Sequence, residues 1–156
     1  MTTRSITVRS ASPEDLHTIV AFNQAMAVET ENRILDPATT ADGVRAGLAH
    51  PGKCTFFVAE ISGAVVGQAM ITTEWSDWNN RFFWWIQSVY VSPAHRRTGV
   101  FRALHGHIRK VASNRQDVCG LRLYVHRKND VALDVYRKLG MQLTDYLLLE
   151  DLFSKG

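Results

Sequence analysis

The part of the chain best suited to bind an anion is a short turn that carries two arginines and a glycine. It reads Arg96-Arg97-Thr98-Gly99 and lies between an apolar segment and an amphipathic one. A strand followed by a glycine turn and a helix directs backbone N–H groups and the positive end of the helix dipole at one point. Guanidinium groups add positive charge there. The turn is therefore predicted to bind phosphate or pyrophosphate, as part of a nucleotide-like cofactor.

The elements on either side of this turn are predicted from hydrophobic patterning. Residues 82–91 form a nearly continuous apolar run, which is typical of a central strand buried on both faces. After the turn, apolar residues recur at the spacing of a helix that packs on a sheet. These residues are Val100, Leu104, Ile108 and Val111.

Upstream of the central strand the sequence predicts one strand, two helices and a hairpin. The strand covers residues 6–9, and Ser12-Pro13-Glu14-Asp15 has the residues of a helix start, which predicts a helix over about 13–28. Thr39 or Thr40 is expected to cap a second helix, which ends near residues 50–52. Residues 54–61 and 65–73 are predicted to form the hairpin.

Downstream of the amphipathic helix the pattern predicts a strand, a helix and two closing strands. The strand covers residues 121–125, and the helix carries an apolar stripe that ends at Gly140. The closing strands are expected at residues 141–143 and 146–149. This order of elements is that of a mixed α/β domain built around one crossover.

Length and composition favour one domain that spans residues 1–156. A chain of 156 residues with 46% hydrophobic content can bury a substantial core. The 18 basic residues are balanced by 15 acidic ones and are spread along the chain, so no nucleic-acid partner is expected. No signal peptide and no apolar run long enough to span a membrane is present, which favours a cytoplasmic location. The histidines lack the spacing of metal ligands, so no metal site is expected.

From residue 6 to residue 149 the chain resembles the GNAT family of acetyl-CoA-dependent N-acetyltransferases. The phosphate signature of that family is Gln or Arg, two residues, Gly, one residue, and then Gly or Ala. Residues 96–100 match it, and Phe101 departs from it. A second signature appears as Asn129, Ala132, Tyr136 and Leu139-Gly140. The resemblance implies a mixed, mostly antiparallel sheet of about seven strands with four flanking helices, and acetyl-CoA as the cofactor.

The resemblance also implies where the cofactor binds. Main-chain N–H groups from Arg97 onward would hold the pyrophosphate, and the backbone of the central strand would pair with the pantetheine arm. The implied cofactor residues are Val89, Tyr90, Val91, Arg96, Arg97, Thr98, Gly99, Val100, Phe101, Arg102, Asn129 and Tyr136. Asn129 would contact the cofactor or cap its helix. Tyr136 is the usual general acid of the family, because a phenol is protonated at neutral pH; the alternative is a core tyrosine on an apolar helix face.

The general base is not determined by the resemblance. Polyamine-acetylating relatives, to which the pattern is nearest, have a Glu at the strand position of Gln87, and glutamine cannot accept a proton at neutral pH. A water could relay the proton to a carboxylate, for which the acidic residues of the first helix end and of the loop are candidates, or the amine arrives neutral. The catalytic candidates are Tyr136, Gln87, Glu31 and Glu74, and the substrate-binding candidates are Glu29, Glu31, Trp78 and Gln87. Solvated surface charges are the alternative for the acidic residues.

The expected function is direct transfer of an acetyl group from acetyl-CoA to the primary amine of a small molecule. One alternative is an N-acetyltransferase of proteins or peptides, and another is a non-catalytic acyl-CoA-binding domain. Members of the family often dimerise through late strands, and the apolar residues 146–149 suit either a homodimer contact or a core strand.

Overall fold

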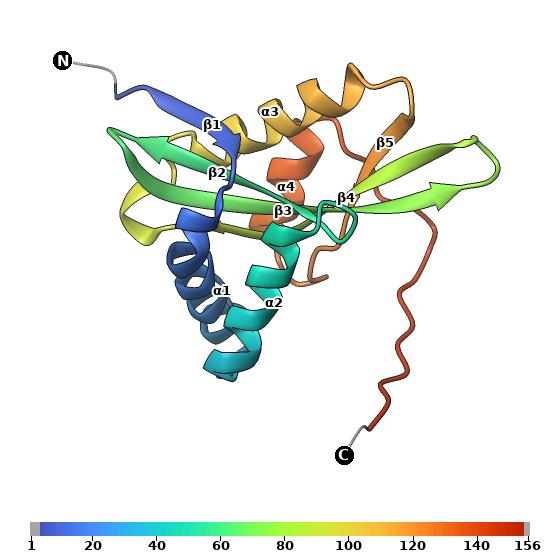
Figure 1. Cartoon of the computed structure of the whole chain (residues 1–156). Helices are drawn as coiled ribbons and strands as arrows, with labels where there is room; N and C mark the ends of the chain where they lie inside the picture. The colour runs from blue at the N-terminus through green and yellow to red at the C-terminus, as the bar shows by residue number, and fades with distance from the viewer. Residues whose placement is uncertain (1–3, 155–156) are drawn as a thin grey trace. The chain divides into compact units, whose positions relative to one another are not determined.

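The computed structural model describes residues 4–154. The chain divides into two compact units, Met1–Tyr124 and Val125–Gly156. The first unit carries five strands and three α-helices in its described part, and the second carries one α-helix. The α/β class and the four helices predicted from the sequence are confirmed (Figure 1).

The first unit is built on a mixed sheet with the strand order β1-β2-β3-β4-β5. The first four strands run antiparallel to their neighbours, and β5 runs parallel to β4. Helix α3 (Val100–Ser113) forms the single crossover between β4 and β5. The strands are β1 (Ile6–Ser10), β2 (Thr55–Ile61), β3 (Ala64–Ser76), β4 (Arg81–Val91) and β5 (Val118–Leu123).

The sheet has five strands, and the prediction of about seven was wrong. Residues 141–149, expected to supply the two closing strands, form no strand in the described chain. Leu147 and Leu149 are 85% and 90% exposed. Hydrophobicity made these residues look like strands, but a strand also needs a neighbour that pairs its backbone groups, and here no ladder forms.

The helices of the first unit begin and end at recognisable signals. Helix α1 (Leu16–Glu31) follows a 3-10 turn at Pro13–Asp15, and the Asp15 carboxylate accepts the Ser12 N–H at 2.7 Å. Helix α2 (Pro37–Ala49) is capped by Asp36, which accepts the Thr39 N–H at 2.8 Å. The predicted caps Thr39 and Thr40 were wrong, because Asp36 directly precedes a proline that favours the first helical position.

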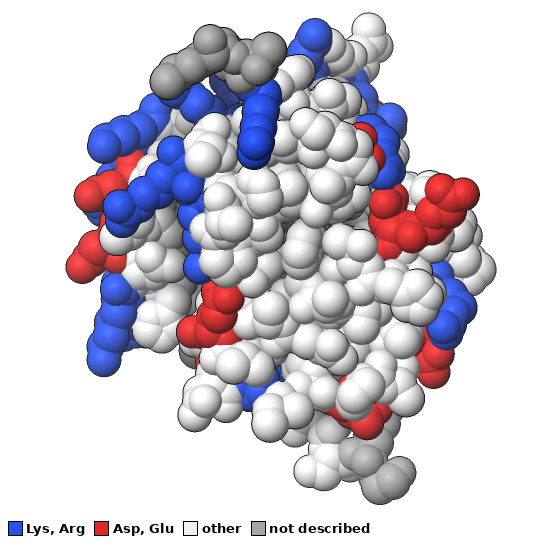
Figure 2. Space-filling view, turned by 90° about the vertical axis from the view of Figure 1, so that its left-hand side faces the viewer, with Lys and Arg blue, Asp and Glu red and all other residues white. Residues whose placement is uncertain are grey.

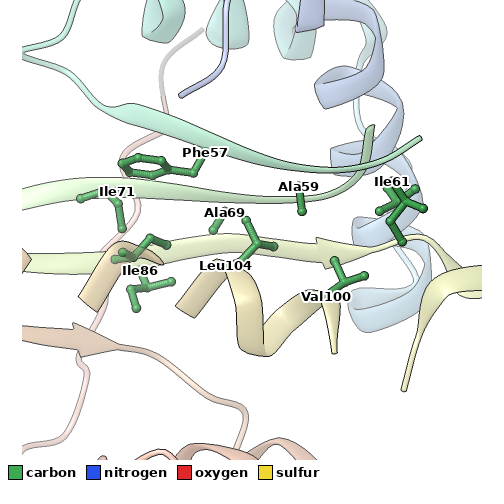
Figure 3. Packing of buried hydrophobic residues seen from close by; sticks show 10 residues of the cluster. Phe57, Ala59, Ile61, Ala69, Ile71, Ile86, Val100 and Leu104 are labelled. Carbon is green, nitrogen blue, oxygen red and sulfur yellow. The ribbon is translucent and has the colours of Figure 1, made fainter. Parts of the chain in front are cut away.

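The sheet has a packed layer on each face (Figure 1). Helix α3 covers one face through Val100, Leu104 and Ile108, which pack with Phe57, Ala59, Ile71 and Ile86 (Figure 3). Helices α1 and α2 cover the other face through Ile19 and Val44, against Phe56 and Val58. Strand β4 is less buried than its apolar run predicted, since only Ile86 and Tyr90 are fully buried.

The second unit contains α4 (Asp130–Lys138) and the chain that follows it. Asn129 caps this helix, because its side-chain oxygen accepts the Ala132 N–H at 3.1 Å. The helix ends at Lys138 with Leu139 as its C-cap, and the next residue, Gly140, has a φ of 90° that suits a glycine. The capping role predicted for Asn129 is confirmed.

Within the described residues, no helix is both long enough and apolar enough to span a membrane. Figure 2 shows Lys and Arg as well as Asp and Glu side chains on the visible face. This distribution agrees with the small net charge of +3.

Candidate active site

Strand β4 departs from regular pairing just before it reaches the turn that is predicted to bind an anion. Gln87 pairs with Met70 and Tyr90 pairs with Gln68, so Ser88 and Val89 together lie opposite the single residue Ala69. Ser88 has a φ of 50°, in the left-handed region. This is a β-bulge, which bends the strand and interrupts its ladder of hydrogen bonds.

The bulge is supported by a buried glutamine that the sequence analysis missed. Gln68 is fully buried, and its Nε2 donates to Asn23 Oδ1 at 2.7 Å and to the Ser88 carbonyl at 3.1 Å. A buried polar side chain needs partners, and here the partners fix the carbonyl at the bulge. The signal in the sequence was a glutamine in the middle of an apolar strand.

Beyond the bulge, one edge of β4 is not paired with β5. Pairing between these two strands covers Phe82 to Ile86 of β4 and ends at Leu123 of β5. The backbone of residues 87–91 on that edge can therefore bond to an extended ligand chain. The side chains of Val89 and Val91 pack against the core beside α3, so their backbone is the part that such a chain could contact.

The turn after β4 is held by side-chain contacts within it. Ser92 Oγ lies 2.9 Å from His95 Nδ1, and Thr98 Oγ1 donates to the His95 carbonyl at 2.6 Å. Arg97 has a φ of 62°, and Gly99, at the N-cap of α3, has a φ of 91°. A φ of 91° would strain any residue with a Cβ, which explains why a glycine occupies the N-cap of α3.

The turn fits an anionic group. Gly99, the N-cap of α3, makes no side-chain cap hydrogen bond, and the N-terminus of a helix is a place where backbone N–H groups suit an anion. The guanidinium-bearing residues Arg97 and Arg102 are exposed beside it. Val100 is 1% exposed and packs in the core, and Phe101 is half-buried.

Arg96, the first residue of the turn, points its side chain toward the end of α1. Its Nη2 donates to Glu29 Oε2 at 2.7 Å, and its Nε donates to the Val91 carbonyl at 2.9 Å. Tyr90 donates to Glu29 Oε1 at 3.0 Å and packs against Phe22 at 5.1 Å between ring centroids. The Arg96 guanidinium holds the pKa of Glu29 below its usual value. Glu29 is therefore an ionised, fully hydrogen-bonded carboxylate.

The face of β4 opposite α3 carries a second set of contacts around Glu74. Arg122 Nη1 donates to both carboxylate oxygens of Glu74 at 3.1 Å, and Trp85 Nε1 donates to Oε2 at 2.8 Å. Trp85 also stacks on Tyr124 with ring centroids 4.4 Å apart, and Arg122 lies 3.6 Å above the Phe83 ring. Arg122 and Tyr124 were not singled out from the sequence, because their partners are distant along the chain.

The remaining candidate residues from the sequence make no contact with Glu74 that was described above. Gln87 Nε2 donates to Thr72 Oγ1 at 2.6 Å. Glu31 is exposed at the end of α1, and Trp78 is 89% exposed in the turn between β3 and β4. Tyr136 lies on α4 in the second unit, and burial raises the pKa of its hydroxyl, which is therefore protonated at neutral pH. Among the described residues, no three His, Cys, Asp or Glu side chains are arranged to hold a metal ion.

Solved structures with this fold include three acetyltransferases. A possible acetyltransferase from Clostridium difficile 630 is 39% identical, with a TM-score of 0.91, and the match covers 96% of this chain and 99% of that one. A predicted acetyltransferase with acetyl-CoA from Clostridium acetobutylicum is 18% identical, with a TM-score of 0.77 and coverage of 94% and 96%. An aminoglycoside acetyltransferase in complex with sisomicin, from an uncultured soil metagenomic sample, is 17% identical, with a TM-score of 0.75 and coverage of 96% and 97%.

A comparison with curated proteins gave no match. The model of the acetyltransferase (GNAT) family matches residues 19–141, which include the bulge, the turn and α4. The chain therefore belongs to the GNAT family of acetyltransferases, which use acetyl-CoA as the acetyl donor.

Proposed function

We propose that this acetyltransferase moves the acetyl group of acetyl-CoA directly to the primary amine of a small molecule. The observation that carries the proposal is the continuity of the donor-binding elements. The bulge at Ser88, the free edge of β4, the turn and the N-terminus of α3 follow one another without interruption from residue 87 to residue 102. Along this stretch, the strand edge would bind an extended ligand chain, and the turn and the start of α3 would bind the phosphates at the end of that chain.

Each part of this stretch would bind a different part of the donor. The main-chain N–H groups from Arg97 to Arg102 would hold the pyrophosphate, and the exposed guanidinium groups of these two residues would add charge. The backbone from Val89 to Val91 would pair with the pantetheine arm. Bound acetyl-CoA supplies an acetyl group activated as a thioester. The Phe101 side chain is not required for these backbone contacts.

The proton that the leaving sulfur requires would come from Tyr136. Its hydroxyl is protonated at neutral pH, because burial raises its pKa. A phenol that holds its proton at neutral pH can still donate it to a departing thiolate. The N-cap at Asn129 fixes the start of the helix that carries Tyr136.

The structure favours some proton acceptors over others. Gln87 cannot act as a base, and its amide donates to Thr72. Glu74 has both carboxylate oxygens occupied by donors from Arg122 and Trp85, so we assign it to shaping the acceptor face. Glu31, exposed at the end of α1, is the candidate for a relay through water. An amine of low pKa would need no such relay.

The acceptor face of β4 suits a compact amine of modest charge. Gln87 and Trp85 lie on the face opposite α3, and Trp85 stacks on Tyr124 to form a flat apolar wall. The carboxylate beside this wall is neutralised by Arg122. An amine with many positive charges would find little net negative charge there, so we expect acceptors with one or two amino groups. Exposed Trp78 could extend this surface by a cation–π contact.

The test is release of free CoA thiol from acetyl-CoA with a panel of monoamines, diamines, polyamines, amino acids and peptides. The expected result is turnover with small amines and a product that carries one acetyl group by mass spectrometry. Acetylated peptides together with unmodified small amines would support the protein N-acetyltransferase alternative instead. Binding of acetyl-CoA without turnover of any amine would support a non-catalytic acyl-CoA-binding domain.

A further inference from the structure

We propose that Glu29 is a positioning residue that holds the Arg96 guanidinium at the end of α1, so that Arg96 shapes the anion-binding turn and makes no contact with the donor's phosphates. This inference rests on the proposed function, because the ligand of the turn is taken to be acetyl-CoA. It gives Glu29 and Arg96 roles different from direct binding of acceptor and donor.

The contacts of Glu29 and Arg96 form a closed set between three elements. Arg96 binds Glu29 Oε2 of α1 and the Val91 carbonyl at the end of β4. Tyr90 of β4 donates to the other carboxylate oxygen of Glu29, and its ring lies 5.3 Å from the Arg96 guanidinium carbon. Each charged group is thus held by more than one contact, which fixes its direction.

The position of Glu29 in α1 explains why it needs a cation. It lies in the last turn of the helix, where the negative end of the helix dipole disfavours a carboxylate. No basic residue of α1 lies in that turn to compensate. Arg96, which is 67 residues later in the chain, supplies the positive charge.

The same contact anchors the start of the turn. Arg96 follows the 3-10 turn at Pro93–His95 and directly precedes Arg97, whose backbone is in the left-handed region. The Thr98 hydroxyl fixes the middle of the turn through the His95 carbonyl, and α3 fixes its end. Because the Arg96 guanidinium is paired with Glu29 of α1, Arg97 and Arg102 are the arginines near the turn that form no ion pair with a described residue.

Both side chains of the ion pair are partly exposed, at 44% for Arg96 and 39% for Glu29. Exposed ion pairs contribute little to global stability. We therefore expect loss of this pair to change donor affinity more clearly than the melting temperature. That separation allows the proposal to be tested with folded variants.

The test measures acetyl-CoA affinity by calorimetry at several salt concentrations for Glu29→Gln, Arg96→Gln and Arg97→Gln. We expect Glu29→Gln and Arg96→Gln each to weaken binding by about three- to tenfold and to leave the salt dependence as in the wild type. Arg97→Gln, the matched control, should weaken binding and also reduce the salt dependence, because a direct charge contact is lost. The double variant Glu29→Gln with Arg96→Gln should be no weaker than either single variant.

Tighter binding of acetyl-CoA by Glu29→Gln would overturn the proposal, because the released Arg96 would then be a direct phosphate ligand. Unchanged binding would overturn it too, because the ion pair would then have no effect on the donor site. A reduced salt dependence in Arg96→Gln would overturn it as well. Circular dichroism melts of each variant show whether it is folded. Absence of binding by the wild type would contradict the proposed function itself, whereas normal wild-type binding with an unaffected Glu29→Gln contradicts this inference alone.

Discussion

The substitution Gly99→Ala tests whether the backbone of the turn before α3 is as strained as its geometry indicates. Gly99 has a φ of 91° and a ψ of 5° at the N-cap of α3. Among the described residues, a Cβ added there would have only Ile6 Cδ1 within 4 Å, at 3.9 Å. The cost of alanine is therefore a backbone cost, with no steric clash to add to it.

The magnitude follows from the conformation alone. An L-residue in the left-handed region costs about 1–2 kcal/mol, and a φ of 91° lies beyond the usual left-handed minimum. For a chain of this length, each kcal/mol lowers the melting temperature by about 2–4 °C. We therefore expect Gly99→Ala to lower the melting temperature by about 2–8 °C.

The assay is thermal unfolding followed by circular dichroism, with Gly106→Ala as the matched control. Gly106 lies within the same helix, is exposed, and has nothing within 4 Å of an added Cβ. Alanine in a helix interior is favoured over glycine by about 0.5–1 kcal/mol, so this variant should melt about 1–4 °C higher. The two substitutions should thus change the melting temperature in opposite directions, although both add one methyl group to α3 or its cap.

A Gly99→Ala variant as stable as the wild type would refute this reasoning, because it would mean that the turn can relax to a conformation open to any residue. A loss of stability in both variants would point to a general effect of substitution on α3 instead.

Four other substitutions, one of them a control, test the site, the electrostatics and the core. Tyr136→Phe should lower kcat by about a hundredfold or more and leave the Kd for acetyl-CoA unchanged, as measured by steady-state kinetics and calorimetry. Asp15 has its pKa lowered, mainly by the hydrogen bond from Arg9, so Asp15→Asn should be less stable than the wild type at neutral pH. That difference should persist down to the ordinary pKa of 3.8 and disappear as the pH falls through the lower folded value, as followed by urea unfolding. Leu104→Ala, at a fully buried position, should cost about 2–5 kcal/mol of unfolding free energy, whereas Leu149→Ala at a 90% exposed position should change it by less than about 0.5 kcal/mol.

Strand β4, the turn at residues 96–99 and helix α3 could be predicted because their signals are local. The apolar run of β4, the proline after it and the helical spacing after Gly99 all lie within a few residues of the elements that they specify. The stop at Gly140 was predictable for the same reason, since its φ of 90° requires a residue without a Cβ.

The bulge and the directions of the charged side chains could not be predicted, because they depend on residues far apart in the sequence. Ser88 takes its conformation where Gln68 of another strand binds its carbonyl, 20 residues away. Glu74 is neutralised by Arg122, 48 residues later. The identity of these residues shows what they can bind, but only the sheet register shows which partner they meet.

The late strands illustrate a different limit. The apolar composition of residues 146–149 predicted a strand, either in the core or at a homodimer contact, yet these residues form no strand and Leu149 is 90% exposed. Hydrophobic patterning identifies residues that can enter a sheet, while a strand forms only where a neighbour accepts its backbone hydrogen bonds.

The most direct test of the central claim, that the turn at residues 96–102 binds acetyl-CoA, is a thermal melt with and without acetyl-CoA for the wild type and for Arg97→Glu. At about one hundred times the Kd, the ligand should stabilise the wild type by roughly 2.7 kcal/mol, which is about 5–11 °C for a chain of this length. Arg97→Glu should show a much smaller shift at the same concentration, because the charge beside the phosphates is reversed. No shift of the wild type at millimolar acetyl-CoA, or an equal shift in both proteins, would contradict the assignment of the donor to this turn.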